Sequence, residues 1–340
     1  GEALEEERAR ELDKEYSKLC RRDKKLHMEN ILSQDTWDTK RTFLPNAKKK
    51  SKGALNLFRP NGTIGESTER EGILASFIKE NLWRKRDSAS TEISELLKNL
   101  NMASIDLNLD RPFTIKELNW ALRRLKNNKS NRPSKISCEE WKTVCCLLEM
   151  EDEVLRLCNF CLINGQFLDR WKFAEVIGLF KKGDPRDPEN YRLVALLDTL
   201  YKIMSRIVTK RILDHVDTYM RATQFGFREK QGCSDALLAL RVILERVAKA
   251  SEFDVTLLFL DWKKAFDSVT REAAETALEK WGIPPKLRAL VHQMLESEFE
   301  VIGQDNQRSQ RLTQDEGLRT GDPLSTVLFI IVLGWVLEGV

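Results

Sequence analysis

The stretch that most constrains the fold is residues 255–269, V-T-L-L-F-L-D-W-K-K-A-F-D-S-V. Its first part, residues 255–260, is a nearly unbroken apolar and partly β-branched run, which predicts a strand buried on both faces. Asp261 ends this run. A carboxylate at the end of a buried strand is held in place by the core behind it, so it can bind a hard cation in a cleft or instead cap the neighbouring backbone. The residues alone leave both roles open for Asp261.

Charge and composition exclude a strong field over the whole surface. The 340 residues include 56 Lys and Arg against 53 Asp and Glu, a net charge of +3. Any nucleic-acid-binding surface must therefore be local. A hydrophobic content of 41%, with 8 Trp and 15 Phe, is typical of a packed globule and not of a disordered chain.

The cysteines indicate a reducing, intracellular compartment. Seven is an odd number, and their spacing shows no disulfide framework. Cys158 and Cys161 form a C-x-x-C pair, but no second pair follows and the three histidines are scattered, so we expect no structural zinc. The alternative is that this pair lies on the buried face of a helix.

The ends of the chain favour neither secretion nor a membrane partner. The acidic N-terminal residues have no apolar core and do not predict a signal peptide. The longest apolar run, residues 327–337, is too short to span a bilayer and predicts a buried helix. Because the chain lacks an initiator Met and ends just after this run, we expect a piece of a longer polypeptide.

Residues 1–54 are predicted to be a charged helical extension and linker. Residues 1–35 are dense in Glu, Arg, Lys and Leu, which favours a solvated helix. The tract K-K-K-S-K at residues 48–52 is either a nuclear-localisation or phosphate-binding tract or part of the charged linker. A nuclear location is therefore one option within the cell.

An amphipathic helix is predicted after Thr114. Thr114 and Glu117 match a capping box, in which each side chain bonds the backbone N–H of the other residue. The apolar stripe of the helix is Leu118, Ala121, Leu122 and Leu125. Its other side and the loop S-N-R-P-S-K are basic, as on many solvated faces, through Arg123, Arg124, Lys126, Lys129, Arg132 and Lys135.

Residues 173–180 and 191–196 predict a β-hairpin around the turn-rich loop K-K-G-D-P-R-D-P-E-N. Lys181 and Lys182 at one end of the loop and Arg192 just beyond the other come to the same end of the hairpin. Arg offers a planar fork and Lys a point charge, so the three can hold a polyphosphate. They fit scattered surface charge equally well.

The other predicted elements are helices and one further hairpin. The helices cover residues 69–83, 198–216, 270–281 and 285–295, and the hairpin pairs residues 299–303 with 310–314. Gly317, Gly321 and Pro323 then predict a bend, whose backbone can come close to a ligand, before the apolar helix.

Four segments of the chain resemble motifs of the reverse transcriptases of LINE-like (non-LTR) retrotransposons. F-L-D-W-K-K-A-F-D-S-V is similar to the first catalytic motif, and L-F-K-K-G-D-P-R-D-P-E-N-Y-R-L-V-A-L-L to the fingers hairpin. Q-F-G-F-R at residues 224–228 and E-G-L-R-T-G-D-P-L-S at residues 316–325 are similar to two further motifs. The resemblance covers residues 55–340 and includes the helical extension before the hairpin.

The resemblance implies roles for individual residues. Asp261 is the implied catalytic residue and magnesium ligand, with two Mg²⁺ ions expected only in a complete palm. Phe266 is the implied steric gate against ribonucleotides. The implied nucleotide-binding residues are Lys181, Lys182, Arg192, Phe266, Thr320 and Gly321. The implied template- and primer-binding residues are Gln224, Arg228 and Arg319.

The chain also departs from the family pattern. Thr320 stands where Gln is usual, and a shorter side chain reaches less far toward a nucleotide. The loop S-N-R-P-S-K lacks the Gly and Asp of the family's Gly-Pro-Asp template loop. The Asp-Asp palm motif is absent and is expected beyond Val340, and neither Asp254 nor Asp267 is placed to replace it.

We therefore predict an α+β fold: the fingers and partial palm of a right-hand polymerase, with a mainly helical N-terminal extension. The predicted segments are 1–54 (charged extension), 55–172 (helical extension), 173–253 (fingers) and 254–340 (partial palm). The implied function is RNA-directed DNA polymerase, which uses dNTPs and Mg²⁺ to extend a DNA primer on an RNA template and is incomplete in this chain. The alternative is a non-catalytic, polymerase-derived module that binds RNA or acts as a scaffold in a larger RNA–protein assembly.

Overall fold

The computed structural model describes residues 56–85, 100–130, 133–147, 150–249, 255–303 and 306–338. The chain divides into two compact units, Gly1–Lys52 and Gly53–Val340, and every described residue belongs to the second. The helix predicted over residues 1–35, the basic tract at residues 48–52 and Arg132 lie outside the described residues.

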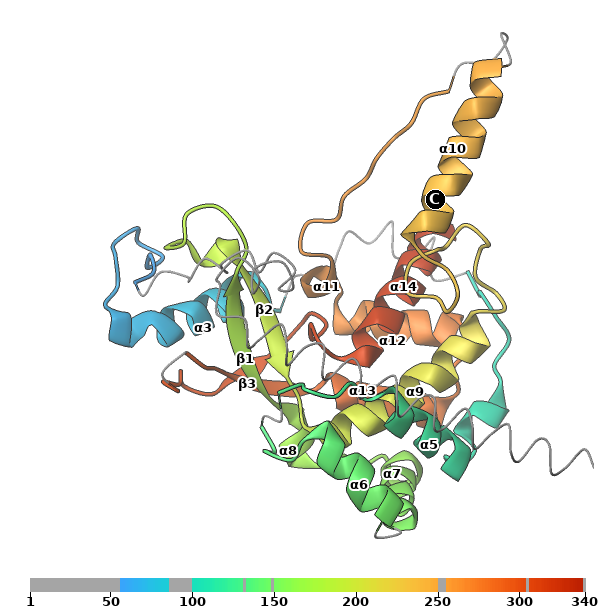
Figure 1. Cartoon of the computed structure of the whole chain (residues 1–340), viewed down its shortest axis with the longest axis horizontal. Coiled ribbons are helices and arrows are strands. Elements are labelled where there is room, and N and C mark those ends of the chain that lie inside the picture. The colour runs from blue at the N-terminus through green and yellow to red at the C-terminus, as the bar shows by residue number, and fades with distance from the viewer. Residues whose placement is uncertain are drawn as a thin grey trace, which may run out of the picture. The chain divides into compact units, whose positions relative to one another are not determined.

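The second unit combines helices with one mixed sheet (Figure 1). Its α-helices are α3 (Arg70–Asn81), α5 (Ile115–Arg124), α6 (Cys138–Leu147), α7 (Glu151–Asn164), α8 (Asp169–Lys172), α9 (Thr199–Val216), α10 (Cys233–Lys249), α11 (Ala265–Ser268), α12 (Arg271–Lys280), α13 (Pro285–Leu295) and α14 (Pro323–Glu338). Short 3₁₀ helices are η1 (Ser67–Glu69), η2 (Leu107–Asp110) and η3 (Pro188–Asn190). The strands are β1 (Phe173–Phe180), β2 (Tyr191–Leu196), β3 (Ser297–Val301) and β4 (Leu312–Gln314).

The sheet has the strand order β2-β1-β3-β4. β1 pairs antiparallel with β2 and parallel with β3, and β3 pairs antiparallel with β4. The hairpin predicted over residues 173–180 and 191–196 is confirmed with these bounds. The second hairpin is also confirmed, but its first strand begins and ends two residues earlier than predicted and its last strand is shorter. Strands from the predicted fingers and the predicted palm thus share one sheet.

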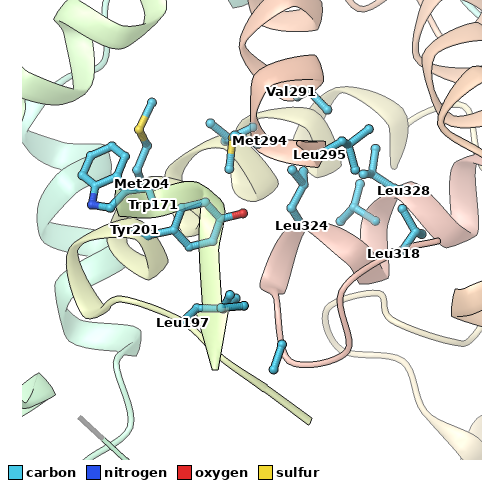
Figure 2. Close-up of a cluster of buried hydrophobic side chains, with 14 of the residues drawn as sticks. Trp171, Leu197, Tyr201, Met204, Val291, Met294, Leu295, Leu318, Leu324 and Leu328 are labelled. Atoms are coloured by element: carbon cyan, nitrogen blue, oxygen red, sulfur yellow. The ribbon is translucent and has the colours of Figure 1, made fainter. Parts of the chain in front are cut away.

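Helix α9 lies in the core of this unit, where it packs against α5 and α14. Asp198 begins it, because its Oδ1 accepts from the backbone N–H of Leu200 at 2.7 Å. Figure 2 shows the buried cluster that α9 forms with α13 and α14, including Tyr201, Met204, Met294, Leu295, Leu324 and Leu328. The apolar run at residues 327–337 is part of α14, and none of the described helices is long and apolar enough to cross a membrane.

The predicted capping box of α5 is confirmed, since Thr114 and Glu117 bond each other's backbone N–H. Glu117 has a second role that links α5 to α9. The guanidinium of Arg211 donates to Glu117 Oε2 at 2.7 Å and to Oε1 at 2.9 Å. It also donates to the carbonyl oxygens of Leu109 and Arg111, at 2.9 and 2.6 Å. Arg211 therefore holds the chain before α5 against α9.

Glu117 should make stability depend on pH. Burial opposes its ionisation, but hydrogen bonds from Arg211 and the Thr114 backbone outweigh burial and lower the pKa of Glu117. Such a carboxylate stabilises the fold above its unfolded pKa of about 4.3 and loses this contribution as the pH falls through its folded pKa. We expect the free energy of unfolding to fall as the pH drops below about 4.3, and Glu117→Gln to flatten that fall. Urea denaturation at a series of pH values measures it, and equal slopes for both proteins would contradict the expectation.

Gly282, which ends α12, is expected to tolerate no side chain. Its φ is +74°, and an added Cβ would lie 2.2 Å from the carbonyl oxygen of Ser104. Gly282→Ala should therefore lower the free energy of unfolding by about 1–3 kcal/mol. Gly72 is the matched control: it lies inside α3 with open space around an added Cβ. Gly72→Ala should raise the same free energy by about 0.5–1 kcal/mol, so effects of equal sign in urea denaturation would contradict the argument.

The C-x-x-C pair lies on the buried face of α7, as one interpretation of the sequence predicts. Cys158 and Cys161 are both 0% exposed. Burial raises the pKa of Cys158 to about 12 and that of Cys161 to about 11. Both thiols are therefore protonated at neutral pH and act as small apolar side chains.

The strand predicted at residues 255–260 is wrong for this structure. These residues form an extended segment without strand pairing (Figure 1), and its large apolar side chains are 42–80% exposed. The preceding helix α10 has no buried residue. A strand needs a neighbour for its backbone N–H and C=O groups, and the described sheet offers this segment none. The apolar pattern of residues 255–260 is typical of a buried segment, but within the described part of the chain these side chains are exposed.

Candidate nucleotide site

A bend at residues 317–322 leads from the β3–β4 hairpin into α14. Gly317 and Gly321 have φ values of +84° and +111°. An added Cβ on Gly321 would lie 2.8 Å from the carbonyl oxygen of Ala195 in β2. Glycine is required there because the bend closely approaches the strand, a partner that sequence reasoning left unspecified.

Thr320 fastens this bend to the outer edge of β2. Its hydroxyl donates to the carbonyl oxygen of Leu193 at 2.6 Å, and its own carbonyl accepts from the N–H of Ala195 at 2.9 Å. β2 is the end strand of the sheet, so these backbone groups would otherwise have no strand partner on that side. Thr320 thus lies beside the strand residue that follows Arg192.

Phe266 of α11 joins the same bend. Its carbonyl oxygen accepts from the N–H of Leu318 at 2.9 Å. Its ring is partly buried, with its centroid 6.2 Å from that of Phe227 and 5.2 Å from that of Phe329. The structure therefore brings Phe266, Thr320 and the strand of Arg192 to one place.

The cations predicted on the hairpin are exposed. Lys181 and Lys182 follow β1, and the side chain of Arg192 projects from β2. The loop between these strands also contacts the segment before α11, because Lys264 Nζ lies 3.2 Å from Glu189 Oε1. This ion pair connects the hairpin loop to the segment that carries Phe266.

Asp261 lies in an extended part of the chain and is exposed. Across the described residues, no group of three or more His, Cys, Asp or Glu side chains is arranged to hold a metal ion. Two catalytic metal ions need several carboxylates that converge on one point. The described residues therefore do not fit a pair of magnesium ions.

Arg228 and Gln224 shape the turn after α9. Arg228 Nε donates to Asp217 Oδ1 at 2.5 Å, and its Nη1 donates to the carbonyl of Arg221 at 3.0 Å. The Gln224 amide donates to the carbonyl of Gly226 at 3.3 Å. Both side chains thus stabilise the turn, and a template contact by either remains a prediction.

Arg319 lies in the core with 4% of its surface exposed. Its Nη2 donates to the hydroxyl of Tyr201 at 2.5 Å and to the carbonyl of Met294 at 2.7 Å, and it lies 3.4 Å from the Asp322 carboxylate. The predicted template contact by Arg319 therefore has no support in this geometry. Sequence reasoning missed Tyr201, because its polar role depends on a partner far along the chain.

Comparison with known proteins identifies the segment that contains all these residues. Residues 180–340 match the family "Reverse transcriptase (RNA-dependent DNA polymerase)". The RNA-directed DNA polymerase from mobile element jockey of Drosophila melanogaster is 30% identical over 176 residues, 51% of this chain and 19% of that protein. The part of the chain from residue 180 onward is thus similar to reverse transcriptases.

Other relatives of the chain carry the names of further transposable elements. The Transposon TX1 uncharacterized 149 kDa protein of Xenopus laevis is 26% identical over 301 residues, 86% of this chain and 22% of that protein. A Pol polyprotein from type-1 retrotransposable element R2 of Nasonia vitripennis is 26% identical over 212 residues, 61% of this chain and 19% of that protein. These names confirm the predicted resemblance to reverse transcriptases of non-LTR retrotransposons. The chain spans about a fifth of the length of these relatives.

Proposed function

We propose that this chain forms the nucleotide-binding part of an RNA-directed DNA polymerase that extends a DNA primer on an RNA template. One observation carries the proposal: the bend with Thr320 and Gly321 is hydrogen-bonded to β2 beside Arg192, and the same bend is hydrogen-bonded to Phe266. Segments far apart in the sequence thus meet at Phe266, at the bend with Thr320 and Gly321, and at the strand of Arg192. In this proposal the β1–β2 hairpin belongs to the fingers, and α11 to α14 belong to the palm.

The exposed cations of the hairpin supply the charge for a dNTP. A guanidinium can bond two phosphate oxygens at once, so we assign the triphosphate to Arg192. Lys181 and Lys182 add point charges near the same end of the hairpin. The ring of Phe266 is held against Phe329, so it can act as a fixed wall beside the sugar. A fixed wall discriminates against the 2′-hydroxyl of a ribonucleotide by its position.

A non-catalytic scaffold is the second candidate, and the exposed apolar surface favours it. Residues 255–260 and α10 expose large apolar side chains one after another along the chain, among them Leu237, Leu238, Ile243, Leu258, Phe259 and Leu260. Exposed apolar surface on this scale marks a site of interaction with another polypeptide. Asp261 directly follows residues 255–260 in the chain. A polypeptide that binds these residues would therefore also affect the position of the Asp261 carboxylate.

Primer extension separates the two candidates. The complete translation product that contains this chain is incubated with an RNA template, an annealed DNA primer, dNTPs and Mg²⁺. Incorporation that requires the RNA template and prefers dNTPs over rNTPs supports the polymerase. Salt-sensitive RNA binding without incorporation supports the scaffold, because contacts to phosphates weaken as the salt concentration rises.

A further inference from the structure

A buried polar network lies directly behind the bend that carries Thr320. Its members are Tyr201 and Ser205 from α9 and Arg319 and Asp322 from the bend, all of them 0–5% exposed. Ser205 Oγ donates to Asp322 Oδ1 at 2.5 Å, and the hydroxyl of Tyr201 donates to Asp322 Oδ2. Arg319 in turn donates to the oxygen of Tyr201. The hydroxyl of Tyr201 thus donates to the Asp322 carboxylate and accepts from the Arg319 guanidinium.

The network is a costly way to stabilise a core. Taking an Arg and an Asp out of water costs more than their attraction returns unless hydrogen bonds complete both groups. Here Arg319 Nη1 has no hydrogen-bond partner within the described part of the chain. Apolar side chains of similar volume often stabilise a buried position as well as a charged network does. What the hydrogen bonds of this network add is a fixed geometry for the bend.

The position of Tyr201 shows how its hydroxyl sets that geometry. Its ring packs near Trp171 and Met204, and Figure 2 shows its oxygen directed toward the ribbon at the start of α14. Burial raises the pKa of Tyr201 well above its ordinary value, so the hydroxyl remains a donor. Asp322 also accepts from the N–H of Leu324 at 3.1 Å, which caps α14. The bend is therefore held at the end nearer α14.

The other side of the same bend contacts the strand of Arg192. Thr320 lies between Arg319 and Gly321, and both of its polar groups bond the edge of β2. A shift of Asp322 or Arg319 would move Thr320 along that edge. The register of Thr320 on β2 thus depends on the network behind it.

We propose that Tyr201 is a positioning residue for the nucleotide site: by bonding Asp322 and Arg319 it holds Thr320 and Gly321 in register on β2 beside Arg192. The role in nucleotide binding rests on the proposed function above. The role in setting the bend does not, and it has its own measurement.

The test is Tyr201→Phe in the whole chain, which deletes one hydroxyl and leaves the ring. Hydrogen exchange followed by NMR reports on the Ala195 amide, which donates to Thr320. We expect this amide to exchange about tenfold faster in the variant, because buried polar groups lose their partner. The Lys181 amide, which donates to Asn190 at the far end of the hairpin, should keep its rate. Ser205→Ala should give the same selective change to a smaller extent.

Ile203→Val is the matched control, since Ile203 is a fully buried residue of α9 without polar contacts. It should lower stability without a selective effect on Ala195. If Tyr201→Phe changes Ala195 no more than Ile203→Val does at equal stability, the hydroxyl only stabilises the core and the proposal is overturned.

Nucleotide affinity completes the test and keeps the two proposals apart. Binding of a fluorescent dNTP to the wild type, with Arg192→Ala as reference, should weaken about tenfold in Tyr201→Phe. Wild-type chain that binds no dNTP overturns the proposed nucleotide site, while the exchange of Ala195 still decides the role of Tyr201 in the bend. Unchanged affinity with faster exchange overturns the link from the bend to the nucleotide.

Discussion

Replacing Arg211 with alanine is expected to lower the free energy of unfolding by about 3–5 kcal/mol. The side chain of Arg211 is 2% exposed, and its five donors serve Glu117 and the backbone carbonyls before α5. Its guanidinium also lies 4.4 Å from the centroid of the Phe113 ring. Alanine would remove two donors from the largely buried Glu117 carboxylate and the donors to several backbone carbonyl oxygens, and each buried group that loses a donor carries a desolvation cost.

Arg111→Ala is the matched control, because Arg111 pairs with the same carboxylate. Its Nη1 lies 3.3 Å from Glu117 Oε2, but its side chain is 53% exposed. Exposed pairs contribute little, so this variant should change the free energy of unfolding by less than about 1 kcal/mol. Urea denaturation of both variants measures the difference. If both variants lower the free energy of unfolding by the same amount, burial does not determine how much the Arg211–Glu117 pair contributes to stability.

Elements with local signals could be predicted from the sequence. Turn residues and alternating apolar residues gave the bounds of the β1–β2 hairpin, and Thr114 and Glu117 marked the start of α5. In each case the interactions that define the element join residues close in the chain. Both partners of each interaction therefore lie within the short segment whose pattern was recognised. The bend could also be predicted from its glycines, because few residues other than Gly readily adopt a positive φ.

Features that depend on distant partners could not be predicted. Arg211 and Arg319 look like surface charges in the sequence, yet both are buried beside carboxylates or hydroxyls. A helical pattern indicates which face of the helix a residue lies on. It does not indicate whether a neighbouring element places an acidic side chain next to that residue. Residues 255–260 show the reverse failure: an apolar run predicts burial, but a strand forms only where another strand offers its hydrogen bonds.

Replacing Asp261 with alanine is expected to reduce RNA-templated primer extension by at least about 100- to 1000-fold. Asp261 is the carboxylate that the reverse transcriptase resemblance assigns to catalysis. Phosphoryl transfer is catalysed mainly by positioning and by electrostatic stabilisation, so loss of one essential charge acts on the rate of synthesis. The measurement is the rate of dNTP incorporation by the complete translation product that contains this chain.

The exposure of Asp261 makes this variant a clean test, because no packing is lost with its carboxylate. The free energy of unfolding should change by no more than about 0.5 kcal/mol, so a loss of synthesis cannot be attributed to unfolding. Asp152→Ala removes another exposed carboxylate, in the first turn of α7, and should leave synthesis unchanged. Full synthesis by Asp261→Ala would remove this residue from the chemistry. Equal losses in both variants would contradict a specific role for Asp261 in synthesis.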